Sequence, residues 1–451
     1  MNEQSAFDLW LEEEKEQDEI LDMLVDELAS SSDEEEPRWG GSKPGKAQNK
    51  ARNFFEAYSK LIKDYFNGSE STYNEADFER RFRMPRSVFS QLFDTIRGHG
   101  SFKQRRDCVG KQGIHPLVRT VACLRHICYG GAYDREDENM RMGEETLRQS
   151  VKEFTRLVVR HFGEEYLNRS PSNEEKNKIL KANAERGFPG CFGSWDCKHF
   201  VWHRCPTRWA GQHAGHSEGG KKTLILEALA DVNRYIWYSN FGDAGALNDL
   251  NVLDKSSIVG SMIDGNFDIT CPSYCINGIW RDWLYFLVDG IYYDWAIFVK
   301  TYSEPTHEKS RFFAKKQEEV RKDVECAFGI LVQKFHILAK PLRSWYLEDI
   351  CYLLDCCVIL HNMVIAARGG SDIILSKEQA TIEVDLNKNK NKRWPLFGGS
   401  ATTDEVLAMD GVDIFAARSG MFAGKMASSR EHFKLKNDLR EHLFEKYTSN
   451  Y

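Results

Sequence analysis

Residues 191–201 read CFGSWDCKHFV, and this stretch decides how the rest of the chain is interpreted. It follows Pro189-Gly190 and is rich in aromatic and apolar residues, which is typical of a short buried strand. Asp196 lies in the middle of it, where a carboxylate is costly unless a partner compensates its charge. The stretch therefore predicts a core strand with an acid that needs a partner.

Three further segments are also short, rich in β-branched or aromatic residues, and bounded by Gly, Asn or Asp. They are 223–231, 235–241 and 283–288, and the residues 231–234 (DVNR) between the first two predict a hairpin turn. Long helices are predicted at 308–335 and 347–367. Three antiparallel strands followed by mixed strands and helices are the order expected of an RNase H-like α/β core.

The residues before this core read as helical. Apolar residues recur at helical spacing in 54–65, 116–129 and 144–162, and Gly130-Gly131 ends the second of these helices. The last helix exposes Arg148, Lys152 and Arg156, which is compatible with a helix-turn-helix unit on DNA. A plain helical bundle with a solvated basic face fits the same pattern, so both interpretations stay open.

These patterns divide the chain into four parts: an acidic, largely disordered tail (1–53), a helical region (54–183), an RNase H-like catalytic domain (184–370), and a linker with a C-terminal amphipathic helix (371–451). The tail has a candidate amphipathic helix at 20–28 and an acidic run, SSSDEEE, at 30–36. The helix could contact a partner or the protein's own basic surface, whereas acidic runs of this kind are usually disordered.

The charge of the chain is unevenly distributed. The net charge is −7, yet residues 1–36 hold fifteen Asp or Glu and one Lys, so the remaining residues carry about +7. A mildly basic body suits a polyanion such as DNA, although this value is also ordinary for its length. Lys43, Lys46, Lys50 and Arg52 form a sparse candidate for a nuclear-import signal.

Composition excludes several classes of protein. There is no run of 18 apolar residues, so we expect no membrane span, and the acidic first 30 residues do not resemble a signal peptide. Twelve cysteines without a dense pattern fit a reduced intracellular protein better than a disulfide scaffold.

Two more acids share the pattern of Asp196. Asp289 directly follows the apolar run LYFLV (284–288), and Glu325 lies in the predicted helix 308–335, with 35 residues between them. Either acid alone is more often a turn residue or a solvated charge. Together, carboxylates at strand ends and on a nearby helix are the arrangement that two-metal phosphodiester cleavage requires.

Several sequence motifs occur in an order and spacing that resemble a known protein family. GFPGCFGSWDCKHFVWHRCPTRWAGQ, TLILEALADVNRYIWYSNFGDAGALNDLNVL, LVDGIYYDW, RKDVECAFGIL and ILHNMV resemble PIF/Harbinger-type transposases, closest to the plant-transposon-protein branch and its domesticated nuclease relatives. The resemblance covers about residues 80–370.

The resemblance implies a DDE catalytic centre. The family's first Asp corresponds to Asp196, the second to Asp289 and the Glu to Glu325, and together they would bind Mg²⁺ (or Mn²⁺). Asp249, in GALNDLNVL, matches another recurrent acid and is an auxiliary candidate. As the second member it would leave 75 residues before Glu325, so Asp289 is preferred.

The implied activity is metal-dependent cleavage and strand transfer at transposon ends in the nucleus (and also the cytoplasm), by a homo-oligomer working with a Myb/SANT-like partner protein. The alternative is a domesticated transposase that binds DNA or protein without cutting. An RNA-cleaving RNase H-like nuclease is disfavoured by the helical N-terminal region.

Two neighbouring clusters offer other interpretations. The residues Arg204, Arg208, Lys221 and Lys222, interleaved with Trp202 and Trp209, could contact phosphates and stacked bases. A zinc site is suggested by Cys197, His199, His203, Cys205, His213 and His216, but no C-x2–4-C pair precedes the histidines. We therefore favour DNA contact over zinc binding here.

Overall fold

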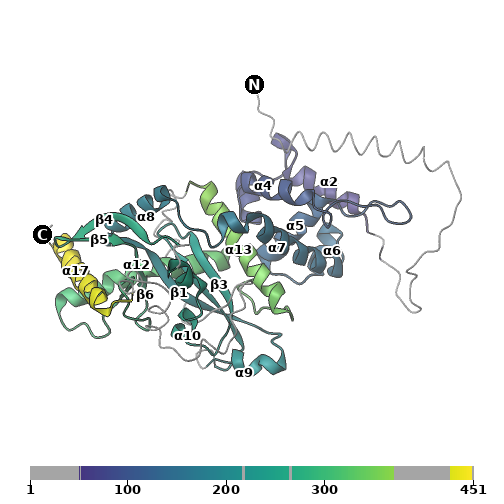
Figure 1. The fold of residues 1–451 in the computed structure, drawn as a ribbon. Coiled ribbons are helices and arrows are strands. Elements are labelled where there is room, and N and C mark those ends of the chain that lie inside the picture. The colour runs from purple at the N-terminus through teal and green to yellow at the C-terminus, as the bar shows by residue number, and fades with distance from the viewer. Residues whose placement is uncertain (1–49, 51, 216–218, 264–266, 370–426, 449–451) are drawn as a thin grey trace.

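A computed structural model describes residues 50, 52–215, 219–263, 267–369 and 427–448. The chain is mixed α/β, with a helical region followed by a sheet flanked by helices (Figure 1). The predicted tail helix at 20–28 and the acidic run at 30–36 lie outside the described residues.

The predicted helical region is confirmed. It consists of α2 (Phe54–Tyr65), α3 (Glu75–Phe82), α4 (Arg86–Arg97), α5 (Pro116–Tyr129), α6 (Arg135–Met140), α7 (Glu144–Tyr166) and α8 (Asn173–Glu185). Local chemistry sets these boundaries: α5 starts with a proline, which needs no hydrogen-bond acceptor there, and the His115 ring caps its first turn. It ends where Gly130 adopts a φ of 57°, a conformation that glycine reaches without strain.

The main sheet has five strands in the order β3-β2-β1-β6-β7. They are β1 (Cys191–Val201), β2 (Thr223–Ala230), β3 (Ile236–Ala244), β6 (Tyr285–Val288) and β7 (Phe298–Lys300). The first three are antiparallel, whereas β6 pairs parallel with β1 and β7 parallel with β6. The predicted strands are all present; the separate hairpin of β4 (Thr270–Ile276) and β5 (Ile279–Trp283) was not predicted.

Helices cover both faces of the sheet. Alternate residues of β1–β3 pack against α12 (Glu308–Lys334) and α13 (Leu347–Ala367) in the largest core, which continues into the helical region. The opposite residues pack near α8, α10 (Asp249–Leu253) and α11 (Ser257–Ile263). The C-terminal helix α17 (Ser429–Thr448) closes the β6–β7 side, at the left of Figure 1.

The helix α13 joins the two halves of the molecule. By length and composition it is the one described helix that could cross a membrane, with a mean hydropathy of 1.9 over its most apolar window. However, 72% of that window is buried inside the fold, against α7 and β3. Because its apolar surface is already covered by protein, α13 is accounted for as a core helix.

Asn362 on α13 ties both halves together through its amide. Its Oδ1 accepts from the backbone N–H of Ile236 at 3.0 Å, and its Nδ2 donates to the carbonyl oxygens of Ile236 and Tyr166, each at 2.8 Å. The side chain is fully buried. One side-chain amide therefore supplies hydrogen-bond partners to backbone groups at the start of β3 and at the last residue of α7.

We expect Asn362→Ala to reduce the free energy of unfolding by about 2–4 kcal/mol, because it strands several buried backbone groups without a partner. Urea denaturation would measure the loss. The matched substitution Asn173→Ala, at an exposed position of α8, should cost under about 0.5 kcal/mol. Equal effects of the two substitutions would contradict this role for Asn362.

Candidate metal centre

Parallel pairing of β1 with β6 brings Asp196 and Asp289 to equivalent positions. Ser194 pairs with Leu287 in the register of the two strands, and each Asp lies two residues further along its own strand direction. Because side chains alternate across a strand, an offset of two keeps both acids on the face of Ser194 and Leu287. That face packs on α12, since the Ser194 hydroxyl donates to the Val320 carbonyl oxygen at 3.1 Å.

The position of Glu325 is set by how α12 docks on the sheet. Gln317, which is fully buried, donates from Nε2 to the carbonyl oxygens of Val288 (3.1 Å) and Val299 (3.0 Å). Val288 is the residue directly before Asp289. Gln317 therefore holds α12 against the end of β6, and Glu325 lies about two helical turns further along the same helix.

Arg321 lies between two of the acids. Its guanidinium is 3.3 Å from Asp196 Oδ2 and 3.1 Å from Glu325 Oε1. Asp196 is 4% exposed and Arg321 is 6% exposed, so water screens these ion pairs little. The helical spacing of four residues puts Arg321 on the same side of α12 as Glu325.

Nearby acids raise the pKa of Arg321. Burial by itself would lower this pKa, but the negative charges of Asp196, Glu325, Asp289 and Glu318 outweigh burial and raise it. The three predicted acids are thus among four that act on this buried positive charge. Asp289 is half-buried, and its Oδ1 accepts from the Gly290 N–H at 2.8 Å.

The donor set suits a hard divalent ion in its chemistry, since Mg²⁺ prefers carboxylate oxygens and retains several waters. Within the described ranges, however, no three His, Cys, Asp or Glu side chains are close enough together to hold one ion. The guanidinium of Arg321 supplies the positive charge between Asp196 and Glu325 in this arrangement. A metal here would share or replace the role of that guanidinium.

A second acid on α12 fixes the helix from the other side. Asp323 accepts from Arg186 through both carboxylate oxygens, at 2.5 and 3.1 Å, and pairs with Arg234 at 2.9 Å. Arg234 has a φ of 69° in the β2–β3 turn. The predicted hairpin turn at 231–234 is thus also a support for α12.

The auxiliary candidate Asp249 lies at the first residue of α10 and is buried. A buried acid that was not predicted from the sequence is Glu227 of β2, which is fully buried. It accepts from Trp195 Nε1 at 2.6 Å and from the Ser256 hydroxyl at 3.1 Å. Glu227 and Trp195 lie on the sheet face opposite Asp196, so Glu227 stabilises the α10–α11 side of the sheet.

The predicted basic patch surrounds the connection between β1 and β2. All four of its cationic side chains are exposed: Arg204, Arg208, Lys221 and Lys222. The guanidinium of Arg208 lies 4.9 Å from the centre of the Trp209 ring. The expectation that Trp202 could stack on bases is wrong, because this ring is 1% exposed and its Nε1 donates to the Ser344 carbonyl oxygen.

The basic residues of α7 are engaged in ion pairs within the protein. Arg148 pairs with Glu145 on its own helix, whereas Lys152 and Arg156 both lie 3.1 Å from Asp349 of α13. Since α7 packs along α13, this face of the helix supports the joint between the two halves. Its use as a DNA-recognition face remains a prediction.

The residues of the zinc interpretation make other contacts where they are described. Cys197 is 3.4 Å from the Tyr292 hydroxyl, and His199 Nδ1 is 2.6 Å from the Thr223 hydroxyl. His213 Nδ1 lies 3.1 Å from the Thr223 carbonyl oxygen. His216 lies outside the described residues.

Comparison with protein families identifies the region that carries these acids. Residues 164–372 match the family described as plant transposon protein. This region is transposon-related. The matched region holds β1, β6 and α12 with all three acids, which confirms the resemblance to PIF/Harbinger-type proteins read from the motifs.

A second match covers residues 58–97 and is described only as a domain of unknown function. It comprises most of α2 together with α3 and α4. No curated protein and no solved structure matches the chain. The assignment of individual residues therefore rests on the geometry described above.

We expect Arg321→Gln to destabilise the metal-free protein by about 3–5 kcal/mol, because Asp196 and Glu325 would lose their shared positive charge in a buried site. Urea denaturation with EDTA present would measure this. Arg311→Gln, near the exposed start of α12, serves as the control. Combining Arg321→Gln with Asp196→Asn and Glu325→Gln should recover part of the loss; a loss below about 1 kcal/mol for the single substitution would contradict the ion-pair role.

Proposed function

We propose that this chain is a DDE-type DNA transposase or endonuclease that cuts phosphodiester bonds with Asp196, Asp289 and Glu325. The observation that carries the proposal is that the buried Arg321 contacts Asp196 and Glu325, while Asp289 lies at the position equivalent to Asp196 on the parallel strand. Structural acids usually pair singly with a cation or cap a turn. Two acids on one buried cation, with a third at the end of the neighbouring parallel strand, are the pattern on which we base a cation-dependent centre.

An RNase H-like core is part of this proposal. Its support is the strand order β3-β2-β1-β6-β7, with three antiparallel strands and two parallel ones. In such a sheet the acids lie in the central strand β1 and at the end of its parallel neighbour β6, where α/β proteins commonly bind ligands. The match of residues 164–372 to a transposon-protein family agrees with this interpretation.

In the proposed mechanism the three carboxylates would hold Mg²⁺ or Mn²⁺. When bound, these ions lower the pKa of water and neutralise charge on the phosphodiester. Gln317 keeps α12 against the end of β6, so the distance between the acids of the strands and Glu325 stays fixed. Arg321 maintains the separation of Asp196 and Glu325 before DNA and metal arrive.

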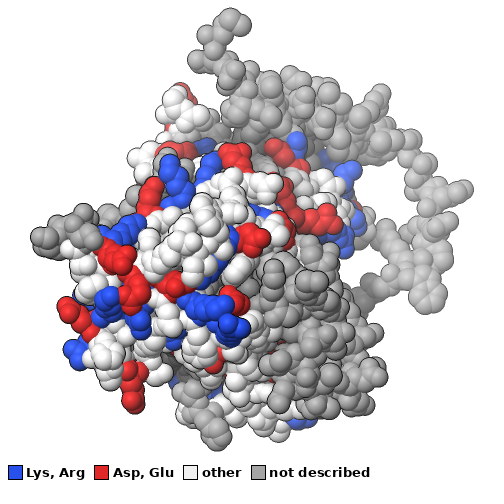
Figure 2. Space-filling model, turned by 60° about the vertical axis from the view of Figure 1, so that its left-hand side comes forward, with Lys and Arg blue, Asp and Glu red and all other residues white. Residues whose placement is uncertain are grey.

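DNA would approach from the end of β1. Arg204 and Arg208 follow this strand, and Val201 lies roughly 17 Å beyond Asp196 at about 3.3 Å per residue. By contrast, the face that brings α17 forward mixes basic and acidic residues without a field of one sign (Figure 2). We therefore assign backbone contacts near the active centre to Arg204, Arg208, Lys221 and Lys222 rather than to that face.

We further propose that the protein acts in the nucleus, as a homo-oligomer with a Myb/SANT-like partner. Of the candidate import signal, Lys50 and Arg52 are described, and both pair with Asp137 of α6. An import receptor would compete with these ion pairs. The strength of the import signal would then depend on how tightly Asp137 holds Arg52.

A domesticated protein that binds DNA without cutting is the second candidate. One observation favours it: a guanidinium already compensates Asp196 and Glu325. In this case Arg321 would be a permanent replacement for metal. The two candidates differ in whether divalent ions bind at this centre.

We expect Asp196→Asn, Asp289→Asn and Glu325→Gln each to reduce Mg²⁺-dependent cleavage of DNA on the order of 10³-fold, because each removes a ligand of the charge-stabilising ion. The assay would use supercoiled plasmid and the family's inverted-repeat ends, with and without the partner protein. Glu319→Gln, an exposed neighbour on α12, and Asp282→Asn, exposed on β5, are matched controls.

Binding of Mn²⁺ provides an independent measurement. Calorimetry should detect binding to the unaltered protein and its loss in Asp196→Asn. Retention of Mg²⁺-dependent cleavage by all three single variants would rule out this centre. Absence of both cleavage and Mn²⁺ binding in the unaltered protein would favour the domesticated candidate.

A further inference from the structure

The helical region has a cavity of about 500 Å³ between the loop after α4 and the start of α5. Seven residues line it, and none is acidic: Gly100, Ser101, Lys103, Arg105, Gly113, Ile114 and Arg119. Lys103, Arg105 and Gly100 are exposed, so the cavity opens to solvent. It is distinct from the acidic centre on the sheet.

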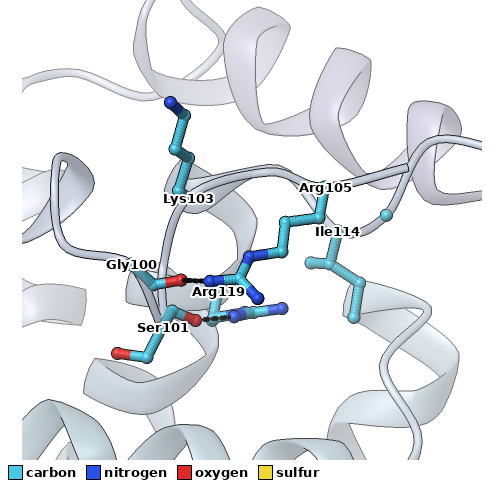
Figure 3. Close-up of a pocket in the computed structure, with 7 residues that line it drawn as sticks. Gly100, Ser101, Lys103, Arg105, Ile114 and Arg119 are labelled. Carbon is cyan, nitrogen blue, oxygen red and sulfur yellow. Dashed lines mark hydrogen bonds between the residues drawn. The ribbon is translucent and has the colours of Figure 1, made fainter. Parts of the chain in front are cut away.

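Two guanidinium groups lie next to each other in this cavity (Figure 3). Arg105 donates to the Gly100 carbonyl oxygen at 2.8 Å, and Arg119 donates from Nη1 to the Ser101 carbonyl oxygen. These adjacent carbonyl groups hold both side chains in place. Lys103 extends away from the pair and lies at the rim.

Neither arginine has a carboxylate partner among the described residues. Three other arginines that are partly or fully buried do: Arg186 pairs with Asp323, Arg281 with Asp438, and Arg321 with two acids. The Nε of Arg119 is buried and has no hydrogen-bond partner in the described structure. The cavity thus has unused donors and uncompensated positive charge.

Electrostatic repulsion makes this arrangement of two arginines costly. Burial lowers the pKa of Arg119, and the positive charge of Arg105 lowers it further. Two like charges at close range destabilise the fold unless an anion offsets them. A guanidinium presents its N–H groups in a planar fork that matches the oxygens of a phosphate.

The surrounding sequence indicates a polyanion rather than a small isolated anion. Residues 97–119 contain six Lys or Arg and a single acid, Asp107. Lys103 and Lys111 of this loop are exposed and unpaired with any described acid. A backbone with a phosphate at every nucleotide could occupy the cavity and contact the loop on either side.

We propose that Arg105 and Arg119 form a binding site for a backbone phosphate of DNA. The inference deepens the proposed function and rests on it for the choice of DNA as the source of the phosphate. It assigns DNA contact in the helical region to the loop between α4 and α5. The basic face of α7, by contrast, is paired with α13.

The test measures binding of the full chain to a 30-base-pair duplex over a range of salt, without divalent metal. Arg105→Gln and Arg119→Gln should each weaken binding about eightfold at 0.1 M salt and reduce the salt slope by about 1, since each phosphate contributes a slope of about 0.9. Arg80→Gln, exposed on α3, is the matched control and should bind as the unaltered chain does.

A stability measurement separates this role from damage to the fold. Removing an uncompensated charge should leave the melting temperature of Arg119→Gln unchanged or raise it, while DNA binding falls. Inorganic phosphate should raise the melting temperature of the unaltered chain and of Arg80→Gln, but not that of Arg105→Gln.

Unchanged duplex affinity in Arg105→Gln and Arg119→Gln would overturn the proposal, whether or not inorganic phosphate binds. A lower melting temperature of Arg119→Gln, with normal binding by Arg105→Gln, would also overturn it. The proposed cleavage is judged separately, because Asp196→Asn affects the metal centre and leaves the cavity intact. Loss of binding in the arginine variants with no cleavage by any form would uphold this site and reject the nuclease.

Discussion

The structure depends on the buried charge of Arg321 and the helix that carries it. α12 crosses the sheet and touches β6, β7 and β1, and at each crossing a polar side chain fixes its position. Without such contacts an amphipathic helix could slide by one turn over an apolar sheet at small cost. With them, Glu325 has one position relative to the strand acids. The candidate centre is therefore a property of helix docking as much as of the acids themselves.

The same arrangement explains why a costly cluster of charges is tolerated in the core. Isolated buried carboxylates would take up protons rather than remain charged. A guanidinium between Asp196 and Glu325 compensates their charge while leaving both oriented toward one point. The pairing gives the protein an internal counter-charge at this point. In the proposed function, a divalent ion would compete with this internal cation, and its affinity would depend on how far Arg321 can move.

The helical region and the sheet share one apolar core through α13 and the amide of Asn362. A DNA segment bound at the α4–α5 loop would consequently be held at a defined distance from the acids on the sheet. Lys152 and Arg156 of α7 add to this connection by pairing with Asp349 of α13. Charges that look like a DNA-binding face in the sequence can therefore serve the internal packing of the protein.

The sequence by itself determined the mixed α/β class, the helical N-terminal region, most strands of the main sheet, and the three acids with the transposon-related motifs around them. These features are local: strand and helix patterns repeat over a few residues, and each acid is marked by its own apolar neighbours. Only the tertiary structure decided that Trp202 is buried, that the cations of α7 are paired internally, and that Arg321 stands between Asp196 and Glu325. Arg321 is 125 residues from Asp196 in sequence, and no local pattern encodes a contact over that distance. Such contacts follow from how α12 packs on the sheet, and packing is the sum of many long-range contacts rather than a property of any one segment.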